Sequence, residues 1–330
     1  MRRDKFTENL QRATLTRRQV INGLVSVGLG AGPLASSLAS AREIDNTSNT
    51  RMVAAIFFES YATLALRRAL RYAGGDGFVA SMPQLLHARV NAPYDNIIWN
   101  TWFTANSEES VVTTPQGNHV VVAVHGGGLF ASPERLERSL RADLSRTNSE
   151  GLTGQYAAKI SDDEVRGLLK GQLPNGLEFP VFPFAEFRRG ISDLPRRYAV
   201  VLDYDLARQS KSGYESFDVL KDDPNMIVRA GGVEPLVAYL DKARNRNNTK
   251  LMGHWHSYNR IDPAQAQTRI PELGGTRGGT GSEGEDQDLG RGLDVDYGIT
   301  GGGAMADLAR YVAVAPRNVS TSLQYVDFEL

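Results

Sequence analysis

Two kinds of side chain in this sequence could carry out chemistry: histidines near glycines and aspartates at the end of an apolar run. Residues 119–130 read HVVVAVHGGGLF, so a β-branched run ends at His125 and the glycines Gly126, Gly127 and Gly128. Backbone N–H groups in such a glycine turn can bind an anion or a developing negative charge. The stretch therefore predicts a ligand-binding loop, with His125 beside it as an acid–base group.

The second candidate group is the aspartate pair of AVVLDYDLA, residues 199–207. Asp203 and Asp205 follow an apolar strand, and the carboxyl end of a strand is a common place for ligands in α/β folds. The motif resembles the first motif of haloacid-dehalogenase-type phosphatases, which implies Asp203 as nucleophile and Asp205 as general acid. Ala207 stands where that family has threonine. The alternative is that these carboxylates are solvated or cap a turn.

Histidines also predict a metal site. His254 and His256 flank one residue, so in an extended segment both imidazoles point to the same side, about 6–7 Å apart at Cα. This spacing suits two ligands of one divalent metal, and His125 is the third candidate. The structural alternative is that each histidine is a surface residue or a hydrogen-bonded core residue. A shared site would require His125, Asp203 and the His254/His256 pair to lie within about 12 Å of one another.

The glycine run also resembles the His-Gly-Gly-Gly motif of hormone-sensitive-lipase-like esterases of the α/β-hydrolase superfamily. The resemblance covers about ten residues and implies an oxyanion hole. That family also has a nucleophile elbow, Gly-x-Ser-x-Gly, and no serine of this chain lies in that frame. The nearest stretch, residues 190–194, reads GISDL and lacks the second glycine. An esterase with only this partial motif is therefore a third alternative, beside a metal- or acid/base-dependent hydrolase and a non-catalytic binding protein.

The N-terminus predicts export. Arg17 and Arg18 precede Val20-Ile21, a glycine- and alanine-rich stretch follows, and Ala39-Ser40-Ala41 is an Ala-x-Ala cleavage pattern. The segment resembles a twin-arginine (Tat) export signal, which implies the Tat machinery as a partner and a periplasmic or secreted mature protein. Residues 1–41 are the expected signal. An uncleaved anchor is the alternative, although its composition would make it a weak one.

Composition narrows the function classes. The chain of 330 residues has no cysteine and a formal net charge of −1. The missing cysteines exclude disulfides, zinc–thiolate sites, Fe–S clusters and cysteine nucleophiles. The balanced charge gives no reason to expect nucleic acid as a partner. No stretch after the predicted signal is long and apolar enough to span a membrane.

The elements that must position these residues are predicted from local signals. Helical periodicity predicts a helix over 52–73 that stops at Gly74, and residues 111–124 predict a hairpin. Cap signals begin helices at Ser132-Pro133 and at Ser161. The remaining elements are a loop at 173–184, strands at 197–206, 309–315 and 321–330, and a helix at 233–244.

Helices and strands alternate without a strict βαβ rhythm, so we expect one α+β (or mixed α/β) domain over 42–330 with a central sheet flanked by helices. Residues 274–303, rich in glycine and acidic residues, predict a flexible insertion. Part of this segment, GGTGSE, resembles one copy of a calcium-binding β-roll repeat. The chain is thus expected to be an exported protein with two main function classes. One is a metal- or acid/base-dependent hydrolase, and the other is a non-catalytic envelope or small-ligand-binding protein.

Overall fold

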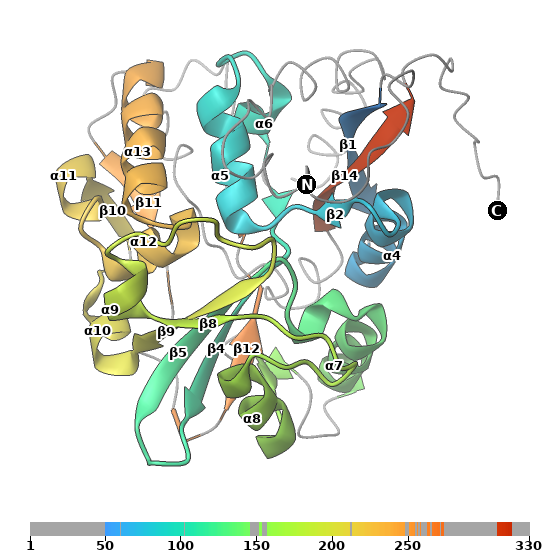
Figure 1. Ribbon diagram of the computed structural model, residues 1–330, viewed down its shortest axis with the longest axis vertical. Helices are drawn as coiled ribbons and strands as arrows, with labels where there is room; N and C mark the ends of the chain where they lie inside the picture. Colours follow the sequence, from blue (N-terminus) through green and yellow to red (C-terminus); the bar gives the residue numbers. More distant parts are fainter. Residues whose placement is uncertain are drawn as a thin grey trace, which may run out of the picture.

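The computed structural model describes residues 50–59, 61–101, 103–145, 152–153, 157–211, 213–247, 251–254, 256, 258, 263–264, 266–270, 272–273 and 309–318. Within them the chain has the predicted α+β fold, with a central mixed sheet flanked by helices (Figure 1). The predicted signal at 1–41, the insertion at 274–303 and the strand at 321–330 lie outside the described residues.

In the described part of the chain the central sheet has seven strands, and of these only the pair at one edge is parallel. Its strands are, in spatial order, β6 (Leu152–Thr153), β7 (Ala157–Lys159), β12 (Gln267–Arg269), β4 (Ser107–Thr113), β5 (His119–His125), β9 (Tyr198–Asp203) and β8 (Val181–Pro183). β9 ends at Asp203 and the helix α10 (Tyr204–Gln209) follows directly, so the strand predicted over 197–206 is shorter than expected.

The predicted hairpin is confirmed as β4 and β5. The two strands pair in an antiparallel register from Ser107 opposite His125 to Thr113 opposite His119. Their β-branched residues are buried on both faces of the sheet. In the connecting turn Gly117 has φ +86°, which a residue with a side chain rarely adopts.

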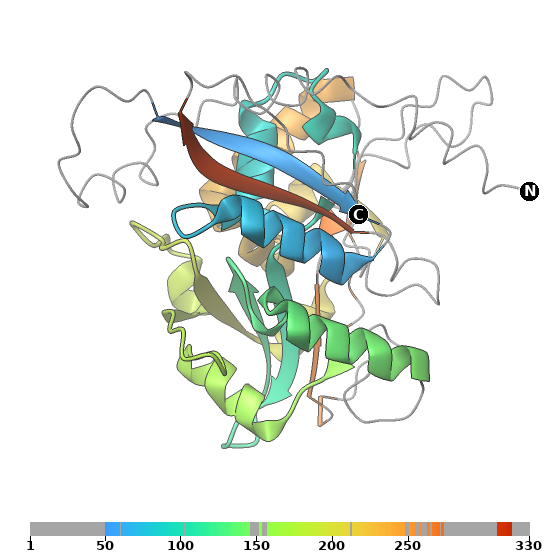
Figure 2. The same ribbon diagram turned by 90° about the vertical axis from the view of Figure 1, so that its right-hand side faces the viewer.

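The helix predicted over 52–73 is wrong in its first half. Residues 50–59 form the strand β1 (Thr50–Glu59), and the helix α4 (Ala62–Ala73) begins only after it. The cause is a distant partner, because β1 pairs along its whole length with β14 (Ala309–Asn318). β14 also pairs with β2 (Phe78–Val79), and α4 packs on this small sheet (Figure 2). The predicted stop of α4 at Gly74 and the strand over 309–315 are confirmed.

Both capped helices occur as predicted. α7 (Pro133–Ser145) follows Ser132, and α8 (Asp162–Lys170) has a capping box between Ser161 and Glu164. Gly171 ends α8 in the left-handed conformation, where a Cβ would meet the Phe179 carbonyl oxygen at 2.0 Å. The predicted 233–244 helix is confirmed as part of α13 (Val233–Asn247). The other elements are α5 (Met82–Asn91), α6 (Ile97–Asn100), β3 (Phe103–Thr104), η1 (Leu129–Ala131), α9 (Phe184–Phe187), β10 (Gly213–Ser216), α11 (Phe217–Leu220), α12 (Pro224–Ala230), β11 (Leu251–His254) and β13 (Glu272–Leu273).

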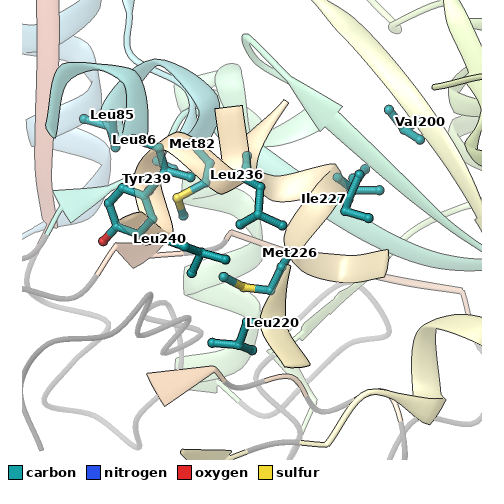
Figure 3. Close-up of a cluster of buried hydrophobic side chains, with 14 of the residues drawn as sticks. Met82, Leu85, Leu86, Val200, Leu220, Met226, Ile227, Leu236, Tyr239 and Leu240 are labelled. Carbon is teal, nitrogen blue, oxygen red and sulfur yellow. The ribbon is translucent and has the colours of Figure 1, made fainter. Parts of the chain in front are cut away.

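The main hydrophobic core lies where α5, α12 and α13 pack beside the central sheet (Figure 3). Met82 of α5, Met226 of α12 and Leu236 of α13 are fully buried there. Figure 3 also shows Val200 of β9 near Ile227 of α12, so the same cluster connects these helices with the sheet. No helix in the described part of the chain has the length and apolar character that a membrane crossing requires.

Candidate functional site

His125 is a buried residue that connects β5 to other segments through hydrogen bonds. It is the last residue of β5, is 2% exposed, and lies opposite Ser107 of β4 and Tyr198 of β9. Its Nε2 is 3.0 Å from the carbonyl oxygen of Val228, which can only accept, so Nε2 carries the proton. Its Nδ1 then accepts from the Ser107 hydroxyl at 2.9 Å. Burial lowers the pKa of His125 to about 4, so the ring is neutral at pH 7 with both nitrogens engaged.

The glycine turn after His125 folds around protein groups. Gly126 and Gly127 have φ values of +82° and +106°, and the Gly126 N–H donates to the Asn106 carbonyl oxygen at 3.0 Å. A Cβ on Gly128 would lie 2.6 Å from Oε2 of Glu108. The same carboxylate oxygen accepts the Phe130 N–H at 2.9 Å. The Glu108 carboxyl group therefore lies against the loop that resembles an oxyanion hole and binds the Phe130 N–H group there.

Glu108 and Glu109 are buried acids that the sequence reasoning did not single out. Side chains of adjacent strand residues point to opposite faces of a sheet, so Glu108 and Glu109 lie on opposite faces of the central sheet. Glu108 accepts the Thr268 hydroxyl at 2.7 Å, and burial raises its pKa to about 7. The signal was present in SEESVV, two consecutive acids in a strand that is otherwise β-branched or small.

Glu109 belongs to what we term the buried polar cluster: Glu109, Arg229, Tyr258, His254 and His256. Arg229 contacts both Glu109 oxygens, with Nε 2.7 Å from Oε1 and Nη2 3.0 Å from Oε2. The Tyr258 hydroxyl donates to Oε2 as well. Arg229 is 1% exposed, so the two charges form a bidentate ion pair inside the protein.

His254 and His256 lie together within this cluster. Their ring centroids are 5.7 Å apart, and His254 Nε2 is 4.0 Å from Oδ1 of Asp223. His256 Nε2 is 2.6 Å from the Ser210 carbonyl oxygen, to which it donates. Burial lowers the pKa of His254 to about 3. Among the described residues no group of three His, Cys, Asp or Glu is arranged to hold a metal ion, so the predicted metal pair has no third ligand there.

Asp203 and Asp205 lie at or beyond the end of β9 that is far from His125. Asp203 pairs with Val120 at one end of β5, whereas His125 is five residues further along, about 17 Å at Cα. Asp203 Oδ1 accepts the Leu206 N–H at 2.9 Å and caps α10. Asp205 pairs with Arg208 on the surface, with side chains that are 69% and 52% exposed. The structure therefore does not bring His125 and Asp203 within the distance that a shared site requires, and the capping alternative fits the Asp203 contacts.

A groove with both apolar and polar lining residues lies between α7 and α8, next to Gly128 of the glycine turn. Its volume is about 980 Å³, and we term it the α7–α8 groove. Leu70 of α4, Asn106, residues 128–129, the first turns of α7 and α8, the turn 172–177 and Arg197 line it. Figure 1 shows α7 and α8 side by side, beside the strands of the central sheet. Of the eight residues predicted for the site, only Gly128 lines this groove.

Comparisons with known proteins support the fold alone. No protein-family model matches the chain, and no curated protein does. One solved structure is similar, with a TM-score of 0.53 and 24% identity, over 82% of this chain and 99% of that chain. Its title is "Accommodation of massive sequence variation in Nanoarchaeota by the C-type lectin fold". This chain thus has a fold similar to the C-type lectin fold of that nanoarchaeal protein.

Proposed function

We propose that this chain is an exported, non-catalytic ligand-binding protein, the second of the two classes that its sequence suggests. The observation that carries the proposal is the separation of the candidate acid–base residues from the open groove. His125 is buried with both nitrogens engaged, Asp203 caps a helix, and neither lines the groove. A general acid or base must reach the reacting atoms within hydrogen-bond distance.

The solved structure that is similar to this chain gives a second line of support. Its title speaks of massive sequence variation accommodated by the C-type lectin fold, and that statement concerns the nanoarchaeal protein. A fold that accommodates sequence variation suits recognition, because one backbone can then present different side chains to different ligands. Applied to this chain, a rigid interior would carry a binding surface made of side chains from loops and helix ends.

Export is the part of the proposal that depends on the sequence. Replacement of Arg17 and Arg18 by lysine should leave the precursor in the cytoplasm, because the twin-arginine pair is what the Tat machinery recognises. Cell fractionation of the producing organism would measure this. Undiminished export of the Arg17→Lys/Arg18→Lys variant would contradict a Tat route.

The binding class is tested against the hydrolase class with generic substrates. The purified chain should hydrolyse p-nitrophenyl acetate and p-nitrophenyl phosphate no faster than the buffer blank, with or without added Zn²⁺. Asp203→Asn is the matched variant, because its amide oxygen can still accept the Leu206 N–H. Turnover by the wild-type chain that the Asp203→Asn variant loses while it stays folded would overturn the proposal in favour of a hydrolase.

A further inference from the structure

The α7–α8 groove contains a half-buried cation whose charge is not matched. Arg197, at the start of β9, donates through Nε to the Gly126 carbonyl oxygen at 3.1 Å. No carboxylate among the described residues lies within ion-pair distance of its guanidinium. Burial lowers the pKa of Arg197, since its charged form loses water there. The outer Nη groups of this side chain are the natural partners of a carboxylate.

The carboxylates of the groove, by contrast, have cationic partners. Glu164 of α8 pairs with Arg135 of α7 at 2.7 Å, and these two side chains are 12% and 7% exposed. Nη2 of Arg135 also donates to the Lys159 carbonyl oxygen at 2.8 Å, so this pair is held firmly between the two helices. Asp163 pairs with Arg166, and Glu134 lies 3.5 Å from Arg67. These acids would repel a ligand with two negative charges more strongly than one with a single charge.

The turn 172–177, which also lines the groove, offers amide and apolar groups on a fixed backbone. The turn is closed by the Leu173 N–H, which donates to the Leu177 carbonyl oxygen at 2.8 Å, and by Gly176 at φ +84°. Oδ1 of Asn175 accepts the Leu177 N–H at 3.2 Å, which leaves the amide nitrogen of this exposed residue for another partner. The Leu177 side chain is 45% exposed. A peptide group and a small apolar side chain match these two features.

From these observations we infer that the groove binds a short peptide through its free C-terminal carboxylate, held by Arg197, with the peptide body against the turn 172–177. The inference deepens the proposed binding function and depends on it. The volume of about 980 Å³ accommodates a ligand of a few residues. A monoanionic carboxylate also agrees with the paired acids of the groove, which disfavour a dianion such as a phosphate monoester.

The test uses calorimetric titration of the full chain with acetyl-Ala-Leu-Ala, either with a free carboxylate or as the C-terminal amide. The free acid should bind at least about tenfold more tightly, as expected for a hydrogen-bonded charge pair. Arg197→Gln should weaken the free acid to the level of the amide and leave the amide unchanged. Arg196→Gln is the matched control, because Arg196 lies over the Phe78 ring and does not line the groove.

Arg197→Lys keeps the charge without the fork of donors and should give an intermediate affinity, which provides a measurement if Arg197→Gln does not fold. Equal affinity for acid and amide, absence of binding, or full binding by Arg197→Gln would overturn the inference. Glucuronate is the third probe, and tighter binding of this acidic sugar than of the peptide would overturn the peptide assignment. The proposed function fails separately, through turnover of the nitrophenyl substrates.

Discussion

The buried polar cluster and the α7–α8 groove contain similar side chains in opposite environments. In the cluster, Arg229 is 1% exposed and meets Glu109 with two hydrogen bonds. In the groove, Arg197 is half-buried and has a backbone carbonyl as partner. A buried charge needs a partner, because burying an unpaired charge costs several kcal/mol. A charge at an open groove is still partly hydrated, so it can remain without an ionic partner until a ligand binds. The difference supports the proposal that recognition resides in the groove, where a cation lies within reach of a ligand, and not in the buried polar cluster, whose ion pair is closed.

The largest effect is expected at the ion pair of the buried polar cluster. Arg229→Ala should lower the free energy of unfolding by about 3–5 kcal/mol, because it leaves the Glu109 charge buried without its partner. Urea unfolding followed by circular dichroism measures the change. Arg166→Ala is the control, since its pair with Asp163 is exposed and should contribute less than about 1 kcal/mol. Equal losses of stability in the two variants would contradict the expectation that the buried ion pair contributes more to stability than the exposed pair.

A smaller loss is expected at His125. His125→Ala removes the acceptor of the Ser107 hydroxyl and the donor to Val228, so it should destabilise the fold by about 1–3 kcal/mol. A catalytic role would instead predict a stable protein with a lost activity. Thermal unfolding together with the nitrophenyl assays separates the two cases, and a variant with unchanged stability would contradict the structural role.

The pH dependence of stability distinguishes the buried histidines from Glu108. His125 and His254 have folded-state pKa values of about 4 and about 3, below the ordinary 6.5, so the unfolded state binds more protons at acid pH. Their contribution is present above pH 6.5 and is lost as the pH falls toward these values. Glu108, with a folded-state pKa raised from 4.5 to about 7, acts oppositely: stability falls as the pH rises from 4.5 to 7.

Glu108→Gln therefore removes the contribution of Glu108 to the pH dependence of stability, which opposes that of the buried histidines. Between pH 4.5 and 6.5 the free energy of unfolding of this variant should rise with pH more steeply than that of the wild type, by at most about 1.4 kcal/mol per pH unit. Urea unfolding at several pH values gives both slopes. Asp163→Asn is an exposed control that should leave the slope unchanged. Identical slopes for Glu108→Gln and the wild type would contradict a raised folded-state pKa of Glu108.

The smallest effect on stability is expected at the groove. Arg197→Gln loses one hydrogen bond to a carbonyl oxygen, so the free energy of unfolding should change by about 1 kcal/mol or less. The same substitution is expected to have the largest effect on peptide binding. A loss of stability as large as that of Arg229→Ala would place Arg197 in the architecture and remove it from recognition.

Local signals in the sequence predicted the parts of the fold that local interactions determine. The β4–β5 hairpin and the Ser161 cap need only neighbouring residues, and both were predicted from the sequence. The strand β1 was missed because its partner β14 lies about 250 residues away in the chain. The pairing with β14 outweighs the helical periodicity of residues 52–59. A local stretch of sequence shows the periodicity but does not show the distant strand with which it will pair.

The candidate site shows the same limit more strongly. His254 and His256 were expected near each other because they are two residues apart, and they are. The separation of His125 from Asp203 depends on the register of β5 with β9, and the Arg229–Glu109 pair joins residues 120 positions apart. The groove as a whole was not predicted, although Gly128 of the predicted ligand loop lines it, because its rim combines the turn 172–177, the starts of α7 and α8, and Arg197. Nothing in the spacing of these residues indicates that they meet.

A backbone amide NMR titration of the isotope-labelled chain with acetyl-Ala-Leu-Ala would show whether recognition resides in the α7–α8 groove. We expect shift changes at Asn106, Gly128, Asn175 and Arg197, and none at His125, His254 or His256. Shift changes centred on the histidines, or on the buried polar cluster as a whole, would contradict the claim that recognition resides in the α7–α8 groove.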